Sequence, residues 1–384
     1  MTLPAAVHNR AIALAPALLM PAFLVVAACG SSPPPEKPLS PEALAAVTKD
    51  AGAPKDQLAR QIDDLFTKSG LGETRAVVLI AKGKLAAERY GPGYDKDTRF
   101  ISWSMAKTVT GVLIGMLVSD GLLALDEPAP VPLWQRPGDP RAEITLRHLL
   151  QMRSGLRHTE AGNPPYESSE VRMLFLDGRD NMAKWAQEQP LEAEPGRKFE
   201  YSSNTSVILA DIAARALATS DKPDARRKAV ADYLQQRLFG PLGMTSMVPE
   251  FDASGTLIGG SLMHATARDW AKLGEFLRLK GRAPAGEQLV PSRWVEAMVT
   301  PSPRSPQYGF QIWLNRSVPK GEEFPLFPDR APKSLFSLIG HMGQYVLVSP
   351  SQHVTLVRLG HSDSEERPPM LQQAADVLEL YPKS

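Results

Sequence analysis

The sequence has one cysteine, Cys29, among its 384 residues. A single thiol forms no disulfide within the chain, so the fold must be held together by its core. The seven histidines are scattered and no His-Glu-x-x-His segment occurs, so we predict no metal site and no cofactor. Gly-x-Ser-x-Gly is absent as well, which argues against the nucleophile elbow of α/β-hydrolases.

An excess of charge of either sign is also missing, since 43 Lys and Arg residues balance 42 Asp and Glu residues without a run of like charge. Nucleic acid is therefore not an expected partner. Hydrophobic residues make up 43% of the chain, which is enough for a large core in one composite domain or two ordinary ones.

The first 53 residues differ in composition from the rest. An uncharged apolar run, interrupted by Pro16 and Pro21, ends in small residues before Cys29. Two prolines and short flanks favour a cleaved signal peptide over residues 1–28 rather than a spanning helix. The residues around Cys29 resemble a bacterial lipobox, which implies acylation of the thiol; a buried free thiol is the alternative. We expect an exported lipoprotein, periplasmic or at the cell surface, anchored to the membrane through Cys29 and a flexible linker over 29–53.

Hydrophobic periodicity in the remaining chain predicts strands near both ends and helices between them. The expected strands are 74–81, 84–90, 307–315, 335–339, 344–348 and 353–359, and the expected helices are 55–68, 105–119, 145–152, 180–188, 204–217, 225–238, 266–280 and 369–380. This order predicts one domain over 54–384 with an α/β (α+β) fold. An antiparallel sheet built from 54–135 and 300–384 is flanked by helices, and a mostly helical subdomain over 136–299 is inserted.

Ser104 and Lys107 stand three apart at the start of the helical pattern 105–119. This spacing places both side chains on one helix face. A serine hydroxyl needs a neighbouring base, and a poorly solvated lysine can be that base when neutral. Chance alone can also produce such a pair. A second match, Ser317 to Lys320, contains a proline and lies in a polar stretch, so we expect it to be accidental.

Four segments occur in an order and at separations that match one family. They are Ser104-Met105-Ala106-Lys107, Ile144-Thr145-Leu146-Arg147-His148-Leu149-Leu150 leading to Ser154-Gly155-Leu156, Phe199-Glu200-Tyr201-Ser202-Ser203-Asn204, and Gly340-His341-Met342-Gly343-Gln344. Together they resemble the serine β-lactamase and penicillin-binding-protein superfamily, nearest to its class C-like branch of β-lactamases, esterases and nylon-oligomer hydrolases. The resemblance implies the β-lactamase/transpeptidase-like fold, with its active site in the cleft between sheet and insert.

By this resemblance Ser104 is the nucleophile that forms an acyl-enzyme, Lys107 is its proton partner, and Tyr201 is the second acid/base group. A protonated Lys107 lowers the pKa of a nearby phenol, whose anion can take the serine proton. The sequence leaves open which of the two is the acylation base. A half-buried aromatic with a satisfied hydroxyl is the alternative for Tyr201. The backbone N–H groups of Ser104 and Gln344 are the expected oxyanion donors.

Two departures from the family pattern concern the substrate-binding residues. The usual Tyr-x-Asn is one residue longer here, so either Ser203 or Asn204 takes the asparagine position, and Asn204 can equally be a helix N-cap. His341-Met342-Gly343 stands where Lys-Thr-Gly is usual. On a strand, His341 would face the cleft and Gly343 would let substrate approach the backbone. An ordinary polar residue at a strand end is the alternative for His341.

These features together predict an envelope-anchored serine hydrolase that cleaves an ester or amide bond of a small-molecule or peptide substrate, because a neutral imidazole clamps a carboxylate poorly. A D-Ala-D-Ala carboxypeptidase or β-lactamase is one alternative, favoured by an envelope location. A non-catalytic envelope binding protein with the same fold is the other, favoured by the altered second and third motifs. His148 is predicted to pack or cap a helix rather than to catalyse.

Overall fold

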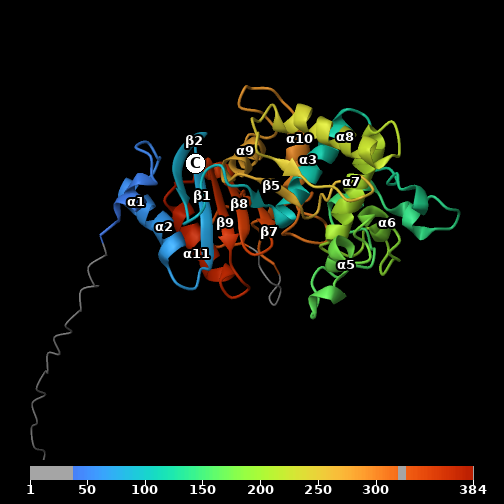
Figure 1. Cartoon of the computed structure of the whole chain (residues 1–384), viewed down its shortest axis with the longest axis horizontal. Coiled ribbons are helices and arrows are strands. Elements are labelled where there is room, and N and C mark those ends of the chain that lie inside the picture. Colours follow the sequence, from blue (N-terminus) through green and yellow to red (C-terminus); the bar gives the residue numbers. More distant parts are fainter. Residues whose placement is uncertain (1–37, 319–325, 384) are drawn as a thin grey trace, which may run out of the picture. The chain divides into compact units, whose positions relative to one another are not determined.

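The computed structural model describes residues 38–318 and 326–383 (Figure 1). Contacts within the chain group residues 39–384 into one unit. The signal peptide predicted over 1–28 and the acylated Cys29 lie outside the described residues. Among the described helices, none combines the length and the apolar character that a membrane crossing requires. Export and anchoring therefore stay predictions.

Nine strands and eleven α-helices are present in the described residues, joined by short helical turns. The strands are β1 Glu73–Ala81, β2 Lys84–Tyr90, β3 Phe100–Ile101, β4 Val248–Pro249, β5 Met263–Ala265, β6 Trp313–Leu314, β7 Phe336–Gly340, β8 Gln344–Ser349 and β9 Val354–His361. The helices are α1 Pro41–Ala45, α2 Lys55–Thr67, α3 Ala106–Ser119, α4 Leu146–Leu150, α5 Ser169–Phe175, α6 Met182–Gln187, α7 Ser203–Leu217, α8 Pro223–Leu234, α9 Ala267–Arg278, α10 Ser292–Met298 and α11 Arg367–Glu379. The 3-10 turn η1, Trp103–Met105, leads into α3.

Strands from both ends of the unit meet in a six-stranded antiparallel sheet with the order β2-β1-β9-β8-β7-β6. The hairpin of β1 and β2 turns at Lys82 and Gly83, which both have positive φ. On its other side β1 pairs with β9, where Val78 lies opposite Val357. An antiparallel sheet flanked by helices is the expected fold class, which is confirmed.

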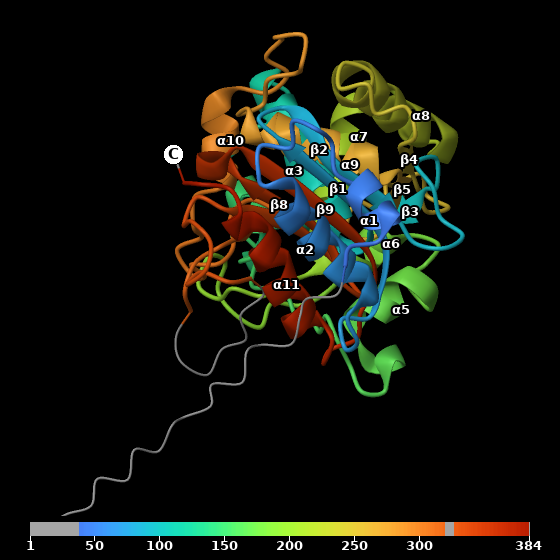
Figure 2. The same cartoon turned by 90° about the vertical axis from the view of Figure 1, so that its left-hand side faces the viewer.

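Successive residues of β1 enter two different cores, as the alternation of a strand requires. Val77 and Leu79 pack with α2 and α11, whereas Ala76 and Val78 join the larger core that contains α3 and α9. Figures 1 and 2 show α2 and α11 on one face of the sheet and α9 on the other. The central strands are therefore buried on both faces, which fixes the sheet as a rigid base for the loops at its edge.

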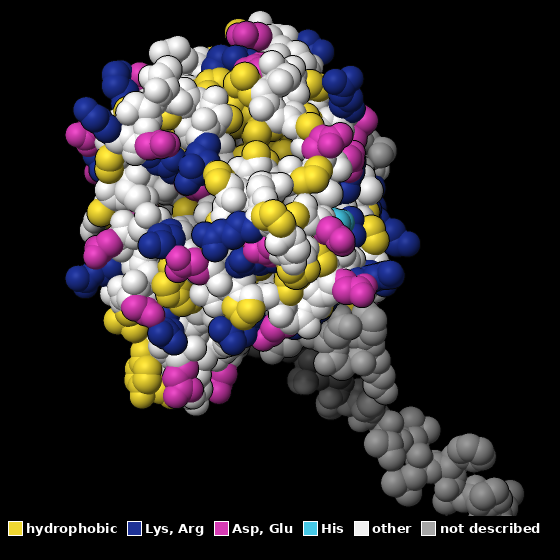
Figure 3. Space-filling model, turned by 90° about the vertical axis from the view of Figure 1, so that its right-hand side faces the viewer, with side chains coloured by type: hydrophobic (Ala, Val, Ile, Leu, Met, Phe, Trp, Pro, Cys, Tyr) yellow, Lys and Arg dark blue, Asp and Glu magenta, His cyan; other side chains and the backbone are white. Residues whose placement is uncertain are grey.

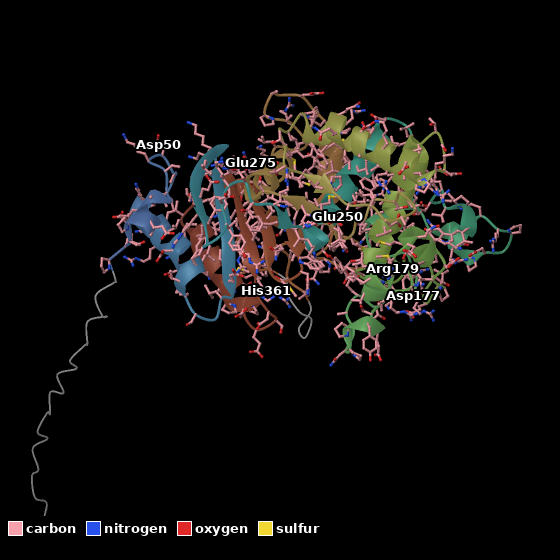
Figure 4. The ribbon with its side chains drawn as sticks, viewed as in Figure 1. Asp50, Asp177, Arg179, Glu250, Glu275 and His361 are labelled. Carbon is pink, nitrogen blue, oxygen red and sulfur yellow. The ribbon has the colours of Figure 1, made fainter. Side chains whose placement is uncertain are left out.

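Helix α9 lies directly on the sheet, although it falls inside the insert predicted over 136–299. Gly274 allows the close approach, because a Cβ there would lie 2.6 Å from Cγ2 of Thr355 and 2.9 Å from Cγ1 of Val346. Glu275, labelled in Figure 4, accepts a hydrogen bond from Oγ1 of Thr355 at 2.6 Å. The insert boundary therefore has to be placed before α9, since this helix covers the sheet.

The Gly274→Ala substitution tests this packing, because the sign of the change in the free energy of unfolding depends on how closely α9 approaches the sheet. In an open helix interior, alanine stabilises by about 1 kcal/mol relative to glycine. Here we expect the free energy of unfolding to fall by about 1–3 kcal/mol, because the added methyl group overpacks the contact with β8 and β9. Urea denaturation of the purified variant measures the change. An increase in stability would mean that α9 does not approach the sheet this closely.

The flexible linker predicted over 29–53 extends too far toward the folded part. Ala43 of α1 is buried, and Val47 is buried in the core between the sheet and α2. Val47 also forms a β-bridge with Ala87 of β2. Residues 39–53 therefore belong to the folded unit, because their small apolar side chains cover the edge of the hairpin.

The strand predicted over 307–315 is reduced to the two residues of β6. Gln311 interrupts it with a left-handed φ of 58°. Its side-chain amide is buried, where it donates to the carbonyl of Leu150 at 3.2 Å and accepts from Oγ of Ser206 at 2.6 Å. The hydrogen-bonding needs of this buried amide override the apolar alternation of the segment.

The helical part is centred on α7, which packs against α3, α4, α6 and α8. A small sheet with the order β3-β5-β4 joins it to the start of α3, with Phe100 opposite Ala265. On the face shown in Figure 3, basic and acidic side chains are interspersed and neither sign gathers into a large patch. The chain leaves β3 directly into η1, so the small sheet fixes where α3 begins.

Candidate active site

Ser104 occupies the turn η1 between β3 and α3. Trp103 before it has a φ of 44°, a left-handed conformation that is uncommon for a bulky residue. Ser102 holds the turn in place: its Oγ donates to the carbonyl of Trp103 at 2.8 Å and accepts from the N–H of Met263 at 3.0 Å. Strain of this kind costs on the order of 1–3 kcal/mol and persists only where the surroundings enforce it. The bond to β5 therefore presents Ser104 in a fixed position.

Lys107 lies in the first turn of α3 and is 1% exposed. Its Nζ donates to Oγ of Ser104 at 3.0 Å, to Oγ of Ser203 at 2.8 Å and to the carbonyl of Gly260 at 2.8 Å. These three acceptors match the three donors of an ammonium group. The structure thus brings together the two side chains that the Ser-x-x-Lys spacing places on one helix face.

Tyr201 comes two residues before α7, and its ring packs against those of Tyr308 and Trp313, with centroids 5.7 and 5.0 Å away. Nζ of Lys107 lies 4.8 Å from the centroid of the Tyr201 ring. Ser104 and Lys107 both lower the pKa of this phenol, against the larger effect of its burial. The three predicted catalytic side chains therefore meet, although they come from α3 and from the segment before α7.

Ser203, and not Asn204, lies beside Lys107. Ser202 is the N-cap of α7 and accepts from the N–H of Thr205 at 3.1 Å, so the capping role considered for Asn204 is wrong. Asn204 is 3% exposed, and neither polar atom of its side chain has a hydrogen-bond partner in the described part of the chain. Of the two alternatives for the longer second motif, the structure favours Ser203 in the position next to the nucleophile.

Two carboxyl groups that no sequence motif marks complete the site. Glu160, in the loop before α5, lies with Oε1 2.6 Å from Oγ of Ser203 and 3.7 Å from Nζ of Lys107. Glu170, in the first turn of α5, places its Oε1 3.0 Å from the same Oγ. Nine residues separate them, including a short 3-10 turn and the start of α5, so neither spacing nor periodicity could have indicated that they converge.

Glu160 is held at the N-terminus of α7, where a helix favours negative charge. Its Oε2 accepts from the N–H of Ser203 at 2.7 Å and from Nε2 of His158 at 2.5 Å. Burial raises the pKa of Glu160, but Lys107 and His158 outweigh burial and lower it to about 2. Burial and the charge of Glu160 raise the pKa of Glu170 to about 7. Near neutral pH Glu160 is therefore ionised, and Glu170 is close to half protonated.

These carboxyl groups also influence Lys107 and Tyr201. Burial lowers the pKa of Lys107, but its acidic neighbours Tyr201, Glu160 and Glu170 outweigh burial and raise the pKa. Burial raises the pKa of Tyr201 more than the charge of Lys107 lowers it. At rest the site thus holds a charged amine beside a neutral phenol.

The third motif forms a tight turn between β7 and β8 instead of a strand. Met342 and Gly343 have φ values of 59° and 84°. A Cβ at Gly343 would lie 2.8 Å from Nη1 of Arg358, a buried guanidinium that donates to the Gly343 carbonyl at 2.9 Å. The strand geometry predicted for His341 and Gly343 is therefore wrong. Gly343 is needed because the turn requires a positive φ and because Arg358 lies close to its Cα. The sequence had instead predicted that the missing side chain lets substrate approach the backbone.

His341 stands at this turn next to the nucleophile, its ring 5.5 Å from that of Trp103 in an edge-to-face contact. Burial lowers the pKa of His341, and nearby positive charge lowers it further, so the imidazole is neutral at pH 7. The structure shows no hydrogen bond from the backbone N–H of His341 to any described residue. Gln344, the predicted oxyanion donor, begins β8, and its side chain donates to the carbonyl of Gly360 at 2.6 Å. His341 is thus a second candidate donor beside Gln344.

Other polar groups have structural roles. His148 caps α4: its Nδ1 accepts from the N–H of Thr145 at 3.3 Å in a capping box, which confirms its predicted role. Across residues 38–318 and 326–383, no three His, Cys, Asp or Glu side chains come together as metal ligands would. The polar groups gathered at the site are Ser104, Lys107, Tyr201, Ser203 and the two carboxyl groups.

Comparison with known proteins identifies the family and the fold. The family model described as Beta-lactamase matches residues 67–379. The 6-aminohexanoate-dimer hydrolase of Paenarthrobacter ureafaciens is 24% identical over 257 residues, which cover 64% of this chain and 62% of that protein. The chain thus matches less than two thirds of the length of that relative.

Two solved structures share the fold. A family VIII carboxylesterase superimposes with a TM-score of 0.60 at 14% identity, covering 89% of this chain and 99% of that chain. A penicillin-binding protein homologue from Caulobacter crescentus gives a TM-score of 0.60 at 16% identity, covering 87% of this chain and 97% of that chain. The family match confirms the resemblance inferred from the four motifs. The chain belongs to the Beta-lactamase family and is a serine hydrolase of the β-lactamase fold.

Proposed function

We propose that the protein cleaves an ester or amide bond through an acyl-enzyme on Ser104, with Lys107 and Tyr201 as the acid/base groups. The observation that carries this proposal is the 3.0 Å contact between Nζ of Lys107 and Oγ of Ser104, with the centroid of the Tyr201 ring 4.8 Å from the same Nζ. Oγ attacks the carbonyl carbon and its proton passes to the Lys107–Tyr201 pair. The leaving alcohol or amine takes that proton as the tetrahedral intermediate collapses, and water then repeats the sequence at the acyl group.

The resting site carries one proton too many for this step, because a charged amine and a neutral phenol are both poor bases. The competent state has lost one proton, either from the ammonium or from the phenol. Two groups that interact this closely titrate as a pair, and both assignments give the same proton balance. We therefore treat Lys107 and Tyr201 as one functional unit.

We assign the oxyanion to the N–H of Ser104 and to an N–H of the β7–β8 turn, from His341 or Gln344. Each such donor is worth about 3 kcal/mol of transition-state stabilisation. The close approach of β7 to the nucleophile turn supports this assignment, because a Cβ on Gly340 would lie 2.3 Å from the carbonyl oxygen of Ser102. Only glycine at position 340 lets the turn come this near to Ser104.

A preference for esters and amides over β-lactams is supported by the neutral His341 at the third motif. A β-lactam or a peptide C-terminus presents a carboxylate, which a fixed cation holds better than an imidazole. The names of the relatives agree: one is a 6-aminohexanoate-dimer hydrolase and another a carboxylesterase. Likeness to a penicillin-binding protein homologue keeps the D-Ala-D-Ala carboxypeptidase as the second candidate.

A substrate panel on the purified protein tests the proposal. We expect kcat/KM for p-nitrophenyl butyrate to exceed that for nitrocefin by about 100-fold or more, since loss of a charge-assisted carboxylate contact costs about 2–3 kcal/mol. A linear amide such as the 6-aminohexanoate dimer is the matched amide substrate. A fluorophosphonate probe should add its mass to the tryptic peptide Phe100–Lys107, which contains Ser104.

The same experiment separates the alternatives. Faster turnover of nitrocefin than of p-nitrophenyl butyrate would indicate a β-lactamase instead. Covalent capture of a fluorescent penicillin, without hydrolysis of any ester, would indicate a D-Ala-D-Ala carboxypeptidase. Absence of any label on Phe100–Lys107 would leave a binding protein of the same fold.

A further inference from the structure

Oγ of Ser203 lies beside one ammonium group and two carboxyl groups, those of Glu160 and Glu170. If both carboxyl groups are ionised, a single hydroxyl cannot form a favourable hydrogen bond with each of these three neighbours. It accepts from Nζ of Lys107 at 2.8 Å, and it lies 2.6 Å from Oε1 of Glu160 and 3.0 Å from Oε1 of Glu170. A serine hydroxyl has one proton to donate and two lone pairs to accept with. The hydroxyl of Ser203 can therefore donate to only one of the two carboxylates. The oxygen of the second carboxylate, if it is ionised, would then face a lone pair of the hydroxyl oxygen and repel it.

A single added proton resolves this arrangement. If Glu170 is protonated, its O–H donates to Oγ of Ser203, which then accepts from Glu170 and Lys107 and donates to Glu160. Every hydrogen-bonding position of the hydroxyl is filled in this way. The opposite choice is disfavoured, because Glu160 already accepts from the N–H of Ser203 and from His158, as an ionised carboxylate does.

We propose that Glu170 holds this proton and acts, through Ser203 and Glu160, as a positioning residue that aims Lys107 at Ser104. The inference rests on the proposed function. The proton on Glu170 is separate from the proton that Ser104 gives up during the reaction, and the reaction does not transfer it. Loss of the proton leaves two ionised carboxylates around one hydroxyl. Their repulsion turns the hydroxyl or draws Lys107 toward the carboxylates, and the contact with Ser104 is lost.

The groups that face Glu170 come from every element packed against it. They are Lys107 of α3, Glu160 with its partner His158 from the preceding loop, Ser203 of α7, and Ser261, whose Oγ lies 3.4 Å from Oε1 of Glu170. Lys107 is the one cation that lowers the pKa of Glu170, and burial together with Glu160 outweighs it, giving about 7. The proton is thus released within the range of an ordinary assay.

Comparison of Glu170→Gln with wild type across pH tests the positioning role. The amide of glutamine donates to Ser203 as a protonated carboxyl does, but it cannot ionise. The ratio of kcat/KM for the variant to kcat/KM for wild type, on p-nitrophenyl butyrate, should therefore rise about thirtyfold between pH 6 and pH 8.5. Taking the ratio cancels the ionisation of Tyr201 and the part of the Lys107 ionisation that does not depend on Glu170. Glu167→Gln, at an exposed carboxylate in the same segment, is the matched control and should give a flat ratio.

Thermal unfolding tests the proton without any substrate. The folded chain holds the proton up to about pH 7, whereas an unfolded glutamate releases it near its ordinary pKa of 4.5. Stability from this group is therefore complete below 4.5 and is lost as pH rises through 7. The melting temperature of wild type should fall between pH 5 and pH 8.5 by more than that of Glu170→Gln. If the variant does not fold, an infrared band of a protonated carboxyl that wild type loses between pH 6 and pH 8.5 supplies the same readout.

The outcomes are distinct. A rising activity ratio together with a weaker pH dependence of unfolding supports the proposal. A flat ratio overturns the positioning role, and equal pH dependence of unfolding in both proteins overturns the proton itself. If wild type hydrolyses none of the esters and amides, the proposed function fails, while the unfolding comparison still decides whether Glu170 carries the proton.

Discussion

The Ser104→Ala variant is expected to lose ester hydrolysis by a factor of about 10⁴ or more in kcat/KM. Without Oγ no acyl-enzyme forms, and the remaining oxyanion donors can only assist direct attack by water. The methyl side chain fits the turn, and Lys107 keeps its contacts with Ser203 and Gly260. We therefore expect the loss in catalysis with little change in stability. Initial rates on p-nitrophenyl butyrate, with melting curves of both proteins, measure the two quantities.

Ser317→Ala is the matched control, because Ser317 opens the second Ser-x-x-Lys match and is exposed. It should keep full activity and full fluorophosphonate labelling, whereas Ser104→Ala should show no label. Labelling of Ser104→Ala at wild-type yield would place the nucleophile elsewhere. Loss of activity in Ser317→Ala would mean that the pair dismissed as accidental takes part in the chemistry.

The parts of the site that sequence predicted are those fixed by local spacing. Ser104 and Lys107 meet because one helical turn separates them, and the hairpin of β1 and β2 forms because its strands are contiguous. Tyr201 could be assigned only through the order of motifs along the chain, since no local rule brings it to α3. The order of motifs could not decide between Ser203 and Asn204, because the extra residue in the second motif leaves both as candidates for the asparagine position. The structure decides between them, because α7 begins at Ser203 and turns this side chain toward Lys107.

The features that the sequence did not predict depend on contacts between distant segments. Glu160 and Glu170 lie in and after an irregular loop, and their proximity follows from how that loop crosses α7. The sequence placed residues 341–343 between two expected strands, and the orientation of His341 and Gly343 was predicted as if they lay on a strand. The buried Arg358 and the left-handed Met342 and Gly343 decide otherwise. Buried polar groups thus set the backbone where hydrophobic pattern alone would predict regular structure.

Replacement of Lys107 by Met is expected to lower kcat/KM by about two to four orders of magnitude, the range for loss of a positioned acid/base group. Met keeps the length of the buried side chain but removes all three donors at Nζ. Glu160 then loses its cation, so we also expect a fall of about 3–5 kcal/mol in the free energy of unfolding, as for other buried charges left unpaired. Activity must therefore be assayed at a temperature where circular dichroism shows the variant to be folded.

Lys107→Arg separates charge from proton transfer. Arginine retains the positive charge beside Glu160, but its guanidinium does not release a proton in proteins. If Lys107 accepts the serine proton, the Arg variant should regain stability and not activity. If Lys107 only stabilises a Tyr201 phenolate, the Arg variant should recover part of both, and Tyr201→Phe should be as inactive as Lys107→Met. Since the two groups act as one unit, the double variant Lys107→Met/Tyr201→Phe should lose little more than either single variant. Losses that multiply in the double variant would show that Lys107 and Tyr201 act at separate steps, which would contradict their assignment to one functional unit.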